Sequence, residues 1–71
     1  MSEMKTIPHL KAWREERKLT QLHLAIKAGV GQMTIIRIEQ GAQAKEQTIQ
    51  RLAHALEVST QDLINGHETQ S

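Results

Sequence analysis

Seventy-one residues, 38% of them apolar and one of them aromatic, can form one small helical core and leave no room for a second domain. The chain has no cysteine, which excludes disulfides and thiolate metal sites, and no run of eighteen apolar residues that would span a membrane. The N-terminus lacks the apolar segment of a signal peptide, so we expect a soluble, cytoplasmic protein.

The charges are distributed unevenly along the chain. The net charge is only +1, but all nine Lys and Arg fall between residues 5 and 51, where four Glu oppose them and leave a net charge of +5. The acidic excess is confined to the two ends of the chain. A basic segment of this kind suits a surface that faces phosphates, although an ordinary solvated surface of mixed charge is the commoner cause.

The spacing of apolar residues predicts three helices in the first half of the chain, over residues 8–18, 21–28 and 32–40. Pro8 suits the first turn of a helix, and Thr20 suits the N-cap of the second. Gly29 and Gly41 supply the left-handed backbone that ends the second and third helices. The inward-facing positions are expected to be Leu10, Trp13, Arg17, Leu24, Ala25, Ala28, Ile35 and Ile38.

The second half of the chain predicts two more helices. The fourth spans residues 47–56, and the fifth follows Ser59, where Asp62 completes a capping box. Runs of alternating strand-forming residues are missing, so we expect an all-α, compact five-helix fold with no sheet. Residues 8–66 form this domain, residues 1–7 an N-terminal arm, and residues 67–71 a disordered tail.

The joint spacing of these elements resembles the Cro/phage-repressor (Xre-type) helix-turn-helix family over residues 10–66. The matching residues are Thr20-Gln21, Leu24-Ala25, Gly29-Val30, Ile35, Arg37-Ile38-Glu39, Gly41, Leu52-Ala53-His54-Ala55-Leu56, Val58-Ser59 and Leu63. The resemblance implies a lambda-repressor-like DNA-binding domain that binds near-palindromic operators in double-stranded DNA as a homodimer. Its third helix would enter the major groove, where base edges carry a donor and acceptor code.

Three residues match family positions that contact base edges: Gln32, Met33 and Arg37. A glutamine can pair with adenine, an arginine with guanine or a phosphate, and a methionine can lie against a thymine methyl group. Each also has a simpler interpretation. Met33 would serve as a gap-filling side chain, and Gln32 and Arg37 would be solvated surface residues.

The resemblance also implies phosphate contacts and one structural ion pair. The candidates for phosphate contacts are Gln21, Gly31, Thr34 and Lys45, while Arg14 and Glu39 would form the ion pair between the first and third helices. Gly31 stands where the family usually has Ser or Thr. The hydroxyl that could cap the third helix and contact a phosphate is therefore missing. Gln21 would otherwise be a solvent-facing residue.

Two surfaces are candidates for protein contacts. The dimer surface is expected at Glu57, Val58, Leu63 and Ile64, and a partner patch at Leu22 and Ile26, one turn apart on the outer side of the second helix. Ordinary packing, or scattered surface residues, is the simpler interpretation of Leu22 and Ile26.

Enzymatic and metal-dependent functions are not expected. The four histidines are scattered without the spacing of a helical metal site, no catalytic constellation converges, and no cofactor is implied. The sequence therefore predicts a sequence-specific transcriptional regulator, a dimeric repressor in its simplest form, that is nucleoid-associated when bound to DNA. The alternative is an antitoxin or another protein-interaction module in which DNA binding is secondary.

Overall fold

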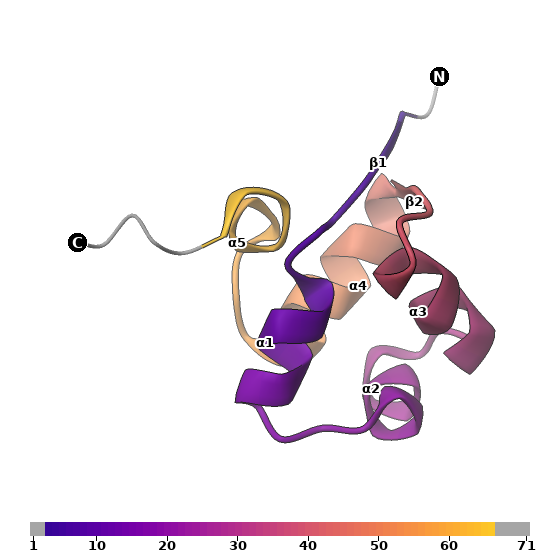
Figure 1. Ribbon diagram of the computed structural model, residues 1–71, viewed down its shortest axis with the longest axis vertical. Helices are drawn as coiled ribbons and strands as arrows, with labels where there is room; N and C mark the ends of the chain where they lie inside the picture. Colours follow the sequence, from indigo (N-terminus) through magenta and orange to yellow (C-terminus); the bar gives the residue numbers. More distant parts are fainter. Residues whose placement is uncertain (1–2, 67–71) are drawn as a thin grey trace.

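Five helices account for most of residues 3–66, the part of the chain that the computed structural model describes (Figure 1). They are α1 (Leu10–Glu16), α2 (Gln21–Ala28), α3 (Gln32–Glu39), α4 (Glu46–Leu56) and α5 (Thr60–Asn65). The predicted all-α class is therefore confirmed. The predicted tail, residues 67–71, lies outside the described residues. Within them, no helix has the length and apolar character needed to cross a membrane.

The core is organised around α4, which contributes five buried side chains and packs against α2 and α5. The α1 helix is fastened to α5 by the Trp13 indole, whose Nε1 donates a hydrogen bond to the Asp62 carbonyl at 3.2 Å. Burial of these apolar side chains is the main stabilising contribution. The buried set is Ile7, Leu10, Trp13, Leu24, Ala25, Ala28, Ile35, Ile38, Ala44, Ile49, Leu52, Ala53, Ala55, Leu56 and Leu63.

Two arginines satisfy carbonyl groups at the ends of helices to which they do not belong. Arg17 Nε donates to the Leu56 carbonyl at 2.8 Å, and Arg51 Nη1 donates to the Gly29 carbonyl at 3.2 Å. The Arg17 guanidinium also lies 5.2 Å from the centre of the Trp13 ring. Carbonyls at a helix end lack partners within the helix, so both arginines stabilise the packing of separate helices.

Four of the helices end in the same way, with a left-handed residue followed by a hydrogen bond back across the last turn. Gly29 and Gly41 occupy this position after α2 and α3, with φ of 73° and 109°, as their residue type predicts. Lys18 and Glu57 occupy it after α1 and α4, with φ of 59° and 62°. The backbone at these two residues is strained, because a Cβ atom disfavours the left-handed conformation.

Replacing Glu57 with glycine is expected to stabilise the protein by about 0.5–1 kcal/mol, because glycine adopts this backbone without a Cβ penalty. The rise in Tm would be roughly 2–8 °C for a domain of this size. Thermal unfolding followed by far-UV circular dichroism measures it. Glu57→Ala is the control, since it removes the same carboxylate and keeps the Cβ. An equal gain in both variants would assign the effect to charge and contradict the backbone explanation.

The N-terminal arm packs against the rest of the domain over the residues of it that the structure describes. Met4–Lys5 (β1) pairs antiparallel with Ala44–Lys45 (β2), with Met4 opposite Lys45 and Lys5 opposite Ala44. Ile7 follows and is 1% exposed. Figure 1 shows β1 running past β2 before the chain enters α1. The prediction of no sheet was therefore wrong, because two-residue strands are too short to show an alternating pattern.

The α1 helix is shorter than predicted at both ends. It begins at Leu10 because Pro8 lies in a turn, in which the Leu10 N–H donates to the Ile7 carbonyl at 3.1 Å. The neighbouring His9 N–H donates to the Leu63 carbonyl at 3.2 Å, which ties this turn to α5. At the other end the helix stops at Glu16, and Lys18 turns the chain toward α2.

Candidate nucleic-acid interface

The α3 helix is buried along one side and open along the other. Ile35 and Ile38 are at most 4% exposed and face the core. Gln32, Met33 and Arg37 are exposed, and the Met33 side chain is 55% accessible. The three residues predicted to contact base edges therefore share one open surface. Ile36, expected on the same open side, is half-buried.

The turn between α2 and α3 holds the two helices in a defined relation. Thr20 caps α2 by accepting a hydrogen bond from the His23 N–H at 3.0 Å, as predicted. At the other end the Gly29 and Val30 N–H groups both donate to the Ala25 carbonyl, at 2.9 and 3.0 Å. Arg51 of α4 also binds this turn. The role of Arg51 could not be predicted from the sequence, because its partner Gly29 is 22 positions away.

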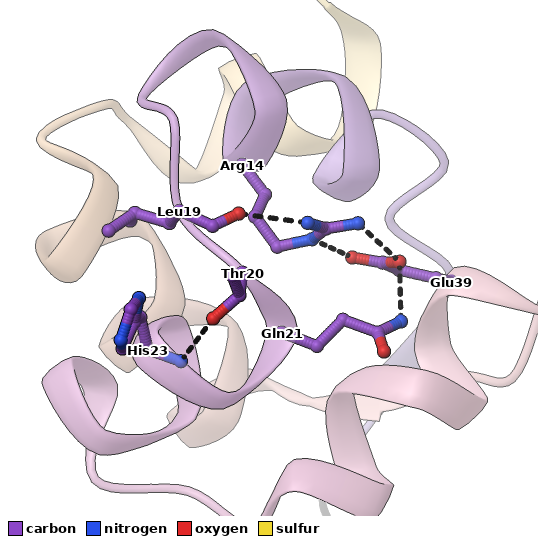
Figure 2. A network of polar contacts seen from close by, with 6 residues as sticks. All are labelled: Arg14, Leu19, Thr20, Gln21, His23 and Glu39. Atoms are coloured by element: carbon purple, nitrogen blue, oxygen red, sulfur yellow. Dashed lines mark hydrogen bonds and ion pairs between the residues drawn. The ribbon is translucent and has the colours of Figure 1, made fainter.

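A polar network joins α1, the start of α2 and the end of α3 (Figure 2). Arg14 Nε donates to Glu39 Oε2 at 2.7 Å, and Arg14 Nη2 donates to Glu39 Oε1 at 3.2 Å. Arg14 Nη1 also donates to the Leu19 carbonyl at 2.9 Å. The hydrogen bond to Glu39 raises the pKa of Arg14 above its ordinary value, although burial opposes this shift. The guanidinium therefore stays charged at physiological pH.

Gln21 is the third member of this network. Its Nε2 donates to Glu39 Oε1 at 3.0 Å, so that Glu39 accepts hydrogen bonds from both Arg14 and Gln21. The side chains of Arg14 and Glu39 are only 11% and 6% exposed. Gln21, predicted to contact phosphate, is therefore already hydrogen-bonded within the protein.

The other predicted phosphate contacts lie at the starts of α3 and α4. Gly31 is the N-cap of α3, with extended backbone and no side-chain cap. A Cβ built there would meet Thr34 Oγ1 at 3.7 Å, so a side chain fits. Thr34 is half-buried. Lys45 belongs to β2 and is exposed at the N-cap of α4.

One member of the predicted dimer surface was assigned incorrectly. Leu63 is 0% exposed because its side chain packs in the core, so it cannot contact a second molecule. Glu57 is exposed, whereas Val58 and Ile64 are half-buried against the edge of the core. These three residues remain the candidate dimer surface.

Leu22 and Ile26 are both exposed on α2, at 49% and 70%. Packing in the core is therefore wrong for these two side chains, and the simpler interpretation that is left is that of scattered surface residues. Within residues 3–66 no three His, Asp or Glu side chains are grouped so that they could hold a metal ion.

Comparison with known proteins assigns this architecture to a family. A helix-turn-helix family model matches residues 10–63. The HTH-type transcriptional repressor RghR of Bacillus subtilis (strain 168) is 46% identical over 57 residues, which are 78% of this chain and 42% of the relative. The chain thus spans less than half of that relative.

The fold is also similar to a chain in the solved SinR protein/SinI protein complex. The TM-score is 0.78 at 25% sequence identity, and the match covers 93% of this chain and 67% of the other. The exposed edge of α3 and the geometry of the α2–α3 turn are consistent with these matches to helix-turn-helix proteins. This chain belongs to the Cro/phage-repressor (Xre-type) helix-turn-helix family of DNA-binding transcriptional regulators.

Proposed function

We propose that this protein is a sequence-specific transcriptional repressor that reads the major groove with α3. The observation that carries the proposal is the division of α3 into a buried edge at Ile35 and Ile38 and an exposed edge at Gln32, Met33 and Arg37. A helix held in this way presents amide, thioether and guanidinium groups to base edges. The similarity to a named repressor supports the direction of regulation.

Phosphate contacts would position this helix in the groove. Gln21, Gly31 and Thr34 lie at or near the starts of α2 and α3, where helix N-termini favour anions. Lys45 supplies a positive charge at the start of α4. Contacts of this kind set register and orientation but carry no sequence information. Base discrimination then depends on the exposed edge of α3.

Two copies of the protein would bind one operator through the surface at Glu57, Val58 and Ile64. Pairing would place two α3 helices about 34 Å apart, one turn of DNA, so the operator would be nearly palindromic. Dimerisation also doubles the phosphate contacts of a chain whose net charge is only +1.

Selection of binding sites from random duplexes, followed by salt titration of the enriched site, tests this function. We expect two inverted half-sites about one helical turn apart and an affinity that falls steeply with salt. Light scattering, with and without the enriched duplex, measures the number of copies. The absence of any enriched sequence would contradict sequence-specific binding, and a single copy on the duplex would contradict the dimer.

A protein-interaction module, such as an antitoxin, is the second candidate function. It is favoured by the exposure of Leu22 and Ile26, since adjacent exposed apolar side chains often mark a protein contact. The two functions are compatible if this patch receives a partner while the protein is bound to DNA. Co-purification of a stoichiometric partner, with no duplex bound, would favour the second function over the first.

The Leu22→Lys/Ile26→Lys variant is expected to keep its Tm and DNA affinity while losing its effect on transcription. Both side chains are exposed, so the substitutions leave the core intact and change only the surface offered to a partner. Leu22→Gln/Ile26→Gln removes the same apolar surface without adding charge and serves as the control. Full regulation by both variants, measured with a reporter gene, would rule out a partner at this patch.

A further inference from the structure

The Gln21 side-chain amide can donate only one hydrogen bond to a phosphate. A carboxylate only accepts hydrogen bonds, so the 3.0 Å contact with Glu39 Oε1 fixes the amide nitrogen of Gln21 toward Glu39 and its carbonyl oxygen away from it. The second hydrogen on Nε2 is then the one side-chain donor that Gln21 retains. Its direction is set by Glu39.

The Glu39 carboxylate is itself held in place by Arg14. Two hydrogen bonds, of 2.7 and 3.2 Å, join the guanidinium to both carboxylate oxygens, and a third ties Arg14 to the Leu19 carbonyl. Leu19 immediately precedes the Thr20 cap of α2. Figure 2 shows these side chains converging at the start of that helix. The network therefore aligns the first turn of α2 with the end of α3.

Charge provides a second constraint on this network. An uncompensated carboxylate at this position would repel a phosphate bound by Gln21, whereas the paired carboxylate contributes almost no net charge. Arg14 thus removes the repulsion, while Glu39 fixes the amide.

We infer that Arg14 and Glu39 are positioning residues for DNA binding, acting through Gln21, rather than a purely structural ion pair. This inference rests on the proposed DNA-binding function and deepens it. Glu39 orients the Gln21 amide before DNA arrives, and so reduces the entropy lost when the phosphate contact forms. Phosphate contacts set the register of α3 in the major groove. The Arg14–Glu39 pair therefore affects how α3 binds the groove without contacting the DNA itself.

A double-mutant cycle between Gln21 and the ion pair tests the inference. The variants are Gln21→Ala, Arg14→Met/Glu39→Met, and the combination of the three, each measured on a mixed-sequence 20-base-pair duplex at low salt. We expect Gln21→Ala to lose roughly ten-fold in affinity, as for one hydrogen bond to a charged partner, and Arg14→Met/Glu39→Met to lose about two- to ten-fold, as for the ordering of one side chain. The triple variant should lose no more than Gln21→Ala, because the pair acts through Gln21.

Gln50→Ala is the matched control. Gln50 Nε2 also donates to a carboxylate, Glu46 Oε2 at 3.2 Å, but on an exposed part of α4 that belongs to no predicted DNA contact. Its affinity for the duplex should be unchanged. If Arg14→Met/Glu39→Met does not fold, Glu39→Asp takes its place in the cycle, since it keeps the charge and withdraws the oxygens from Gln21.

A measurement on the free protein separates positioning from stability. In wild type, ¹⁵N relaxation should show that the Gln21 side-chain amide is ordered. In Arg14→Met/Glu39→Met, at a temperature where the variant is fully folded, the same amide should be mobile. Additive losses in the cycle, an unaffected Gln21→Ala, or an equally mobile amide in wild type would each overturn this inference alone. Failure of wild type to bind any duplex would overturn the proposed function as well.

Discussion

Replacing Ile7 with alanine is expected to lower the free energy of unfolding by about 2–5 kcal/mol, the cost of truncating a fully buried aliphatic side chain. Ile7 is 1% exposed and belongs to the same core as Leu10 and Leu63. Small domains have total stabilities near the lower end of 5–15 kcal/mol, so this loss would leave much of the protein unfolded at 37 °C. Urea unfolding followed by circular dichroism measures the change.

Met4→Ala is the matched control for Ile7→Ala. Met4 lies in the same segment, three residues earlier, but its side chain is 48% exposed. Its replacement should change stability by less than about 0.5 kcal/mol, as for most surface substitutions. Equal and small effects at the two positions would show that this segment contributes little to the core, as a free arm would.

Replacing Arg37 with alanine is expected to cost about 1–3 kcal/mol on the selected operator, a loss of roughly 5- to 150-fold, and to relax specificity at one base position. Arg37 is exposed one helical turn after Met33, on the open edge of α3. Its truncation leaves Ile35 and Ile38 in the core, so the fold should be unaffected. Fluorescence anisotropy on the operator and on its single-base variants measures both effects.

Lys45→Ala is the comparison that distinguishes a base contact by Arg37 from a phosphate contact. Lys45 is exposed at the start of α4 and carries a charge suited to a phosphate. Its loss should weaken binding to all duplexes alike and reduce the slope of log affinity against log salt by about 1. An Arg37→Ala variant that behaved in the same way, with unchanged base preference, would reassign Arg37 to the phosphate backbone.

Local sequence signals predicted the helices well. Thr20, Gly29, Gly41 and the Ser59–Asp62 capping box each act on backbone within a few residues, so a residue type at the right spacing is enough to reveal them. The periodic burial of Ile35 and Ile38 likewise left Gln32, Met33 and Arg37 on the open edge. The predicted pairing of Arg14 with Glu39 came from resemblance to the family rather than from periodicity.

Other features could not be read from a local pattern. The strands have two residues each, too few to alternate visibly, and their pairing joins residues 39 and 41 positions apart. Lys18 and Glu57 adopt left-handed backbone without the glycine that would announce it. Leu63 is one of two adjacent apolar residues, with Ile64, on a short helix. Nothing local indicates that α5 turns this side chain fully inward.

The sequence by itself determined the number and order of the helices, the N-terminal caps of α2 and α5, the glycines that end α2 and α3, and the exposed edge of α3, because each depends on neighbours within about two helical turns. Only the tertiary structure decided that Ile7 completes the core, that Arg17 and Arg51 close the ends of other helices, and that Gln21 shares Glu39 with Arg14. The hydrogen bonds of Arg17, Gln21 and Arg51 join residues that are 18 to 39 positions apart. Their geometry is set by how the helices pack, which no single segment encodes.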